Sequence, residues 1–92
     1  MEKHCYIIMY DLRKPGRDYN SLYNAIKSYM IWGKITESTW AIVSDSNSSS
    51  IRDHLIKYID TNDRLMVIQS GKHAAWTNSL ASNDWLKQNL IK

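Results

Sequence analysis

The sequence predicts one α+β domain followed by a C-terminal extension. Short apolar runs rich in β-branched and aromatic residues alternate with segments in which apolar residues recur at helical spacing. The 92 residues suffice for one hydrophobic core but are too few for a second module. Hydrophobic residues make up 43% and charged residues 23%, as in ordinary globular chains. We expect a single domain over 1–92, with a core over about 3–70 and an extension over 71–92.

The first strand is predicted over residues 6–12, a nearly continuous apolar run. Such a run is typical of a central strand that is buried on both faces. It ends beside one carboxylate, Asp11, and Pro15 and Gly16 prevent it from continuing. Because side chains at strand ends often line a crevice, Asp11 is a candidate site residue.

Two amphipathic helices are predicted over residues 19–29 and 51–59, where apolar residues follow the i, i+3, i+4, i+7 spacing. Asp18 is the expected N-cap of the first helix, which should stop near Gly33. One of the last serines of the polar loop 45–50 is expected to cap the second helix.

The remaining elements complete the order strand, helix, strand, strand, helix, strand. Ile35 and residues 39–43 indicate two short strands or one bent strand, and residues 64–69 indicate a clear strand. A terminal helix is expected over 83–90, capped by Asn83 or Asp84. The order is that of a ferredoxin-like βαββαβ domain, with an antiparallel sheet and two helices on one face. A second copy, the extension or a ligand must cover the other face.

The composition narrows the location and the partners. The formal charge of +3 permits contact with phosphates without requiring it. No apolar run approaches the roughly 20 residues of a membrane helix, and residues 1–5 lack the layout of a signal peptide. The single Cys5 fits a reducing compartment, so we expect a cytoplasmic protein that makes no membrane contact. Four Trp, six Tyr and no Phe favour a dimer or a binding surface.

The aromatic residues divide into two groups by spacing. Tyr23 and Trp40 match buried faces and are predicted to pack in the core. Trp32, Trp76 and Trp85 are less constrained. They are expected to pack at a dimer interface or over the open sheet face, with stacking on bases as the alternative.

Over roughly its first seventy residues, the chain resembles a known family. Tyr-Asp-Leu at 10–12, a basic turn and a helix resemble the start of the CRISPR-associated protein two superfamily, the small metal-dependent endonucleases of spacer adaptation. Residues 37–40 and 51–68 resemble later parts of that family in the same order. The segments 10–19 and 22–23 are most similar to short stand-alone relatives, often called SinR-like. Virulence-associated protein D, a ribonuclease toxin, is a more distant relative.

The resemblance implies a homodimer in which Asp11 from each chain holds one divalent cation, Mg²⁺ or Mn²⁺. Two carboxylates in close approach repel unless a cation or a proton lies between them, so the arrangement is physically reasonable. It also implies that Arg13, Lys14 and Arg17 position the phosphate backbone of RNA or DNA, and that Ser38 lies near the cleft. The expected reaction is phosphodiester hydrolysis.

The residues themselves leave simpler interpretations open. A lone Asp11 at a strand end can cap a turn, and the basic residues can form a solvated turn. The hydroxyl of Ser38 can bond the backbone at a bulge. A non-catalytic dimer that binds nucleic acid, a nucleotide or a protein partner is therefore the alternative function. A toxin–antitoxin or phage-defence setting fits either function.

Overall fold

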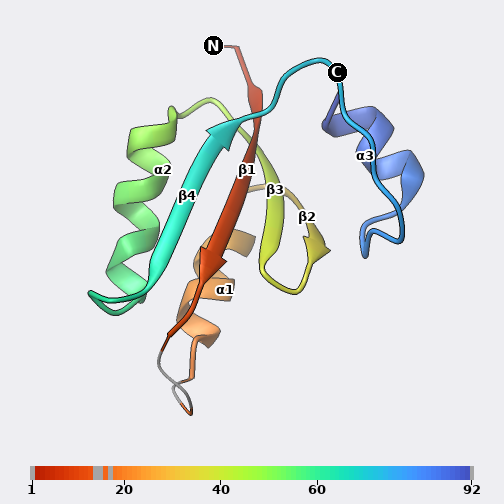
Figure 1. The fold of residues 1–92 in the computed structure, drawn as a ribbon. Helices are drawn as coiled ribbons and strands as arrows, with labels where there is room; N and C mark the ends of the chain where they lie inside the picture. Colours follow the sequence, from red (N-terminus) through yellow and green to blue (C-terminus); the bar gives the residue numbers. More distant parts are fainter. Residues whose placement is uncertain (1, 14–15, 17, 92) are drawn as a thin grey trace.

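The computed structural model describes residues 2–13, 16 and 18–91. Its strands form a single four-stranded antiparallel sheet in the order β2-β3-β1-β4 within these residues. The predicted α+β class is confirmed (Figure 1). The elements in chain order are β1 (His4–Asp11), α1 (Asn20–Lys27), β2 (Ile31–Thr36), β3 (Thr39–Ser44), α2 (Ser48–Leu55), the 3₁₀ helix η1 (Ile56–Tyr58), β4 (Arg64–Gln69) and α3 (Asn83–Asn89).

β1 is a central strand, as predicted, since it pairs with β3 on one side and β4 on the other. It begins two residues before the expected 6–12 and ends at Asp11. The prediction that both of its faces are buried is wrong at its second half. Tyr6, Ile8 and Tyr10 face the core, but Met9 is 37% exposed, because that part of the outer face has no covering element among the described residues.

The main core lies between the sheet and two helices. Side chains of α1 and α2 pack on the sheet face that carries Ile8, Trp40 and Ile42. Trp40 is only 2% exposed, and its indole Nε1 donates to the hydroxyl of Tyr10 at 2.8 Å. The predicted burial of Trp40 is confirmed, and Tyr23 packs against this core as a partly buried residue. No helix among the described residues is long and apolar enough to span a bilayer.

The helices are shorter than their apolar spacing predicts. α1 ends at Lys27 instead of reaching residue 29, and Gly33 lies inside β2 instead of ending the helix. The predicted second helix over 51–59 is α2, which begins at Ser48, followed by η1. Met30 is 94% exposed, because the chain has already turned toward β2 at that position. The region 35–43 forms two strands, and β4 has the predicted bounds.

The capping residues differ from the predictions by one to three positions. Tyr19 is the N-cap of α1 without a side-chain cap, while Asp18 accepts from the backbone N–H of Asn20 at 2.8 Å. Asn47, not a serine, caps α2. Ser82, not Asn83 or Asp84, caps α3. Several polar residues precede each helix, and the local backbone conformation, which spacing does not give, selects the cap.

The C-terminal extension covers one half of the outer sheet face. Leu86 of α3 and Leu90, the C-cap residue of α3, pack with Cys5 and Ala41 in a second cluster. The backbone N–H of Leu80 also donates to the carbonyl of Ile35 on β2 at 2.9 Å. The extension thus covers the β2 and β3 side of the outer face (Figure 1). It is one of the three covers expected from the sequence, the others being a second copy and a ligand. Trp76 and Trp85 pack against this cluster, which confirms the packing expected for them.

Gly33 is the point where α3 approaches the sheet most closely. A Cβ added to Gly33 would lie 3.0 Å from Cζ2 and Cη2 of Trp85, closer than almost any relaxed contact. The indole therefore rests on the bare backbone of β2 at this position. A side chain at Gly33 requires the indole of Trp85 to move by at least a few tenths of an ångström, and valine, which adds two further methyl groups, requires more.

The substitution Gly33→Val is predicted to loosen the extension, even though valine favours strands. Cys5 reports loosening of the extension, because it lies in the cluster that the extension covers. Its burial limits access by a reagent, and burial also raises the pKa of the thiol, so both effects slow labelling in the native chain. We expect Ellman's reagent to label Cys5 at least about tenfold faster in Gly33→Val than in the native chain. Gly71→Val is the control, since an added Cβ there meets no atom within 4 Å. Equal labelling rates in all three proteins would show that this contact does not hold the extension.

Candidate functional site

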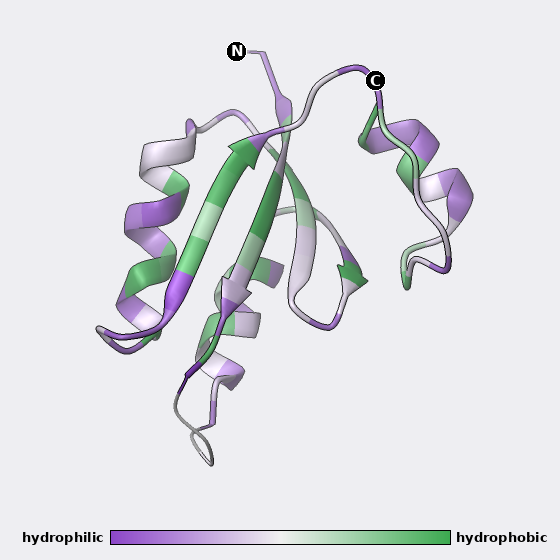
Figure 2. Cartoon of the chain, in the orientation of Figure 1, coloured by the Kyte–Doolittle hydropathy of each residue, from purple (hydrophilic) through white to green (hydrophobic). Residues whose placement is uncertain are grey.

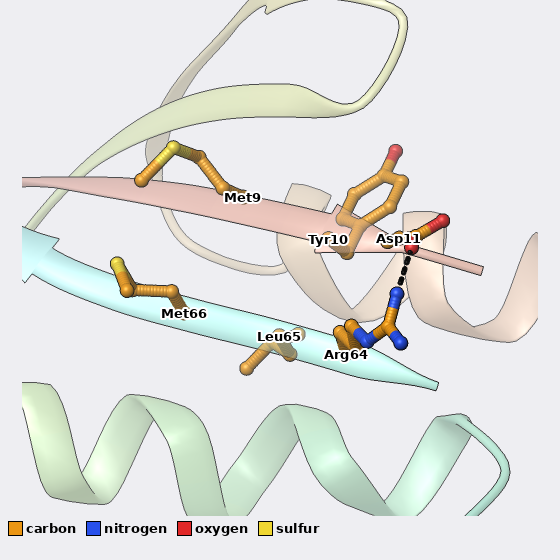
Figure 3. A pocket seen from close by; sticks show the side chains of 6 residues that line it. All are labelled: Met9, Tyr10, Asp11, Arg64, Leu65 and Met66. Carbon is orange, nitrogen blue, oxygen red and sulfur yellow. Dashed lines mark hydrogen bonds and ion pairs between the residues drawn. The ribbon is translucent and has the colours of Figure 1, made fainter. Parts of the chain in front are cut away.

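Asp11 lies at the end of β1, where the sheet meets the basic turn. In the antiparallel register Asp11 is directly opposite Arg64, the first residue of β4. Nη1 of Arg64 donates to Oδ2 of Asp11 at 2.8 Å, as Figure 3 shows. Nη1 of Arg13 donates to the same oxygen at 3.2 Å. Two guanidinium groups therefore converge on one carboxylate, whose Oδ1 takes part in neither contact.

These ion pairs are exposed and therefore weak. The side chain of Asp11 is 54% exposed, and those of Arg13 and Arg64 are 44% and 67% exposed. Water and salt screen such pairs, which typically contribute about 0–1 kcal/mol. The carboxylate can exchange its guanidinium partners for another cation, and the guanidinium groups can exchange it for a phosphate, at small cost.

Asp63 holds the backbone next to this site. Its carboxylate accepts from the backbone N–H of Arg13 at 2.6 Å and from the hydroxyl of Tyr19 at 2.9 Å. It also accepts from the backbone N–H of Asp60 at 2.8 Å. One half-buried carboxylate thus ties the segment after β1 to the start of α1 and to the turn before β4. This fixes where Arg13 leaves the sheet.

A shallow apolar depression of about 340 Å³ adjoins Asp11 on the outer face. Met9 of β1 and Met66 of β4 are register partners and lie side by side there (Figure 3). Met66 is 56% exposed and Ile68, on the same face of β4, is 50% exposed. Figure 2 shows hydrophobic colouring along the middle of β1 and β4, between hydrophilic ends. We call Met9, Met66 and Ile68 the open face.

The other predicted site residues have different positions. Ser38 lies in the β2–β3 turn, where its carbonyl accepts from the backbone N–H of Tyr10 at 3.1 Å. Its own backbone N–H donates to Oγ1 of Thr36 at 3.4 Å, so the backbone places it at the same end of the sheet as Asp11. Lys14 and Arg17 lie outside the described residues. The structure therefore brings together Asp11 and Arg13, with Ser38 on the neighbouring turn.

Two residues of this site have no role in the sequence prediction. Arg64 reaches Asp11 only through the β1–β4 register, although the strand over 64–69 is evident in the sequence. If the two strands had been paired so that opposite charges lay across from each other, the contact between Arg64 and Asp11 could have been predicted. Asp63 contacts residues 44 and 50 positions earlier, and such long-range polar contacts leave no local signal.

Asp11 is the candidate metal ligand that each chain contributes. Among the described residues, no group of three or more His, Cys, Asp or Glu side chains is placed to hold an ion. Mg²⁺ is, however, commonly bound by one or two carboxylates together with several waters. A second Asp11 from another copy would add a second carboxylate to such a set.

Comparison with known proteins gives the fold and no family. No family model matches the chain. Its structure is similar to the crystal structure of a hypothetical protein, TT1823, from Thermus thermophilus, with a TM-score of 0.67 and 20% sequence identity. The match covers 87% of this chain and 98% of that one. At this identity the likeness shows a shared fold alone.

Asp63→Asn is predicted to destabilise the protein and to free the segment that carries Arg13. The amide replaces one accepting oxygen with a donor that faces other donors, which typically costs about 1–3 kcal/mol. Urea unfolding should show a loss in this range, and the amide of Arg13 should exchange its hydrogen faster. Asp53→Asn is the matched control, because that carboxylate is 62% exposed and contacts only the neighbouring Arg52 in the described hydrogen bonds. Unchanged stability and exchange in Asp63→Asn would contradict this role.

Proposed function

We propose that the protein is a homodimeric, divalent-metal-dependent endonuclease in which Asp11 from each copy holds the cation. One observation carries this proposal: Asp11 is exposed and lies on the same sheet face as the open face, at its edge. The cross-strand pairs Ile7 with Ile68, Met9 with Met66 and Asp11 with Arg64 follow one another along this face. An apolar strip thus ends in a charged pair.

A second copy is the proposed cover for this strip. Two-fold dimers place the same patch of each subunit against itself, so residues near the axis meet their own counterparts. Burial of Met66 and Ile68 would supply apolar contact area, while the C-terminal extension leaves these side chains exposed. A two-fold axis near the end of β1 would then bring the two Asp11 carboxylates together.

Each residue of the site has a proposed task. The two Asp11 carboxylates hold the cation, and Arg13 and Arg64 exchange their contact with Oδ2 for the phosphates of the substrate. A bound divalent cation supplies an activated water and stabilises negative charge on phosphate. Asp63 keeps Arg13 in place through its backbone N–H. Lys14 and Arg17 are proposed to contact further phosphates along the nucleic-acid strand.

The fold gives further support. We propose that the α+β domain is ferredoxin-like, because its chain order combines with the strand order β2-β3-β1-β4 and both α1 and α2 pack on one face. The sequence resemblance to the CRISPR-associated protein two superfamily and its stand-alone relatives supports the same reaction.

We propose that the protein acts in the cytoplasm. We also propose that Mg²⁺ is its cofactor and that Mn²⁺ can substitute for it.

The proposal predicts metal-dependent cleavage that requires Asp11. Purified protein should degrade labelled RNA or duplex DNA with Mg²⁺ or Mn²⁺ and not with EDTA. Asp11→Asn keeps the shape of the side chain but removes its charge, so we expect a rate loss of at least about 100-fold. Asp53→Asn, which changes an exposed carboxylate on α2, should retain the native rate. Equal rates for Asp11→Asn and the native protein would refute the proposal, as would the absence of cleavage by the native protein.

A non-catalytic dimer that binds nucleic acid is the second candidate function. The convergence of Arg13 and Arg64 on the single carboxylate of Asp11 favours it, since two cations at one strand end suit a phosphate. A nucleotide or a protein partner, in a toxin–antitoxin or phage-defence setting, would use the same surface.

Binding measurements separate the two functions. Under the second function, Asp11→Asn should bind a labelled oligonucleotide at least as tightly as the native chain and cleave nothing. Replacing Arg13, Lys14 and Arg17 together by Gln should weaken binding and flatten its dependence on salt. Binding that responds neither to salt nor to these residues would exclude a nucleic-acid partner at this turn.

A further inference from the structure

A row of aromatic rings runs from the Asp11 end of β1 to the edge strand β2. The ring centroids of Tyr10 and Tyr23 are 6.2 Å apart, and those of Tyr23 and Trp40 are 6.3 Å apart. Trp40 and Trp32 follow at 5.7 Å. The row is buried at Trp40, which is 2% exposed, and reaches solvent at Trp32, which is 39% exposed. Trp32 is thus an exposed ring that the core supports from behind.

Two lysines lie beside the outer end of this row. Nζ of Lys27, on α1, is 5.4 Å from the ring centroid of Trp32 and 5.9 Å from that of Trp40. Nζ of Lys34, on β2, is 5.4 Å from the centroid of Trp40 and 6.0 Å from that of Tyr23. Both ammonium groups are close enough to the aromatic faces for cation–π attraction. Positive charge therefore lies over Trp32, at Lys27, and over the adjoining Trp40, at Lys34.

The acidic group near these lysines is weakly engaged. Oε2 of Glu37 is 3.4 Å from Nζ of Lys34, but the side chain of Glu37 is 90% exposed. An exposed pair of this kind is screened by water and yields to a polyanion. The two tail tryptophans differ from Trp32, because both pack in the cluster under α3. Trp32 lies on the opposite face of β2 from Gly33 and from the indole of Trp85.

We propose that Trp32, Lys27 and Lys34 form a binding site for single-stranded nucleic acid. A base stacks on the indole of Trp32 and displaces the ammonium group of Lys27 from the ring, and the flanking phosphates contact Lys27 and Lys34. Stacking on an exposed ring next to basic groups is how sequence-tolerant single-strand binding arises. A duplex hides its base faces, so this site discriminates against it. The inference rests on the proposed function only in taking nucleic acid as the partner.

Trp32 and Asp11 lie on opposite faces of the sheet, so one nucleic-acid strand can contact both only by passing around the end of the sheet. Trp32 is paired through Ile42 with Tyr6, five positions before Asp11 on β1. Strand rise and strand spacing place Trp32 and Asp11 about 20 Å apart, a distance that a few extended nucleotides cover. The path around the sheet to the opposite face, where Asp11 lies, adds to this distance.

The proposal is tested by measuring the binding of a fluorescein-labelled 12-nucleotide pyrimidine strand, once as RNA and once as DNA. EDTA is added to remove divalent cations, so that the proposed cleavage does not interfere with the measurement. Trp32→Leu keeps an apolar side chain but removes the stacking face, so its Kd should rise at least about fivefold. Trp32→Tyr should stay within about threefold of the native chain, because it keeps a ring. Lys27→Gln with Lys34→Gln should weaken binding and reduce its salt dependence. Lys57→Gln, an exposed lysine on η1, is the charge control and should change binding less.

The outcomes separate this inference from the proposed function. An unchanged Kd in Trp32→Leu, with circular dichroism showing the native fold, overturns the inference even if Asp11-dependent cleavage is found. Tighter binding of the duplex than of the single strand, or no binding by the native chain, also overturns it. Weaker binding in Trp32→Leu and native-like binding in Trp32→Tyr support it, whether or not the protein cleaves the strand.

Discussion

The antiparallel pairing of β1 with β4 is the constraint on which the candidate site depends. In its register, Asp11 faces Arg64 and Met9 faces Met66, so one charged pair ends an apolar strip on the outer face. Because side chains alternate between faces, a shift of one residue would turn Asp11 toward α1 and α2. The core side chains Tyr6, Ile8 and Tyr10 of β1 fix this register from the opposite face. Core packing and the site are therefore two consequences of the same alternation.

The C-terminal extension divides the outer face into a closed half and an open half. The indole of Trp85 over the bare backbone of Gly33, with Leu86 and Leu90, closes the half over β2 and β3. Met66 and Ile68 on β4 stay exposed. Exposed apolar side chains beside a site are typical of surfaces that meet another molecule. The proposed dimer uses this open half, and the proposed single-strand site uses the edge of β2 on the helix side.

Much of the fold was predictable because its signals are local. The strand Arg64–Gln69 has the predicted bounds, since polar residues precede it and Ser70 and Gly71 follow it. The helix ends and caps were wrong, because Asn47 and Ser82 compete with nearby polar residues and only the backbone conformation decides between them. The sequence named Asp11 and Arg13 as candidate residues, and the structure places these two side chains in contact. Arg64 and Asp63 join the site through tertiary contacts, which one sequence without pairing information does not contain.

The number of cations bound per chain tests most directly whether Asp11 is half of a shared site. Titration with Mn²⁺, followed by electron paramagnetic resonance of the free ion, counts bound ions, and sedimentation equilibrium on the same samples gives the oligomeric state. We expect a dimer that binds one Mn²⁺ per two chains at the Asp11 site, and we expect Asp11→Asn to abolish this binding. A monomer, one ion per chain, or equal binding by Asp11→Asn would contradict this expectation.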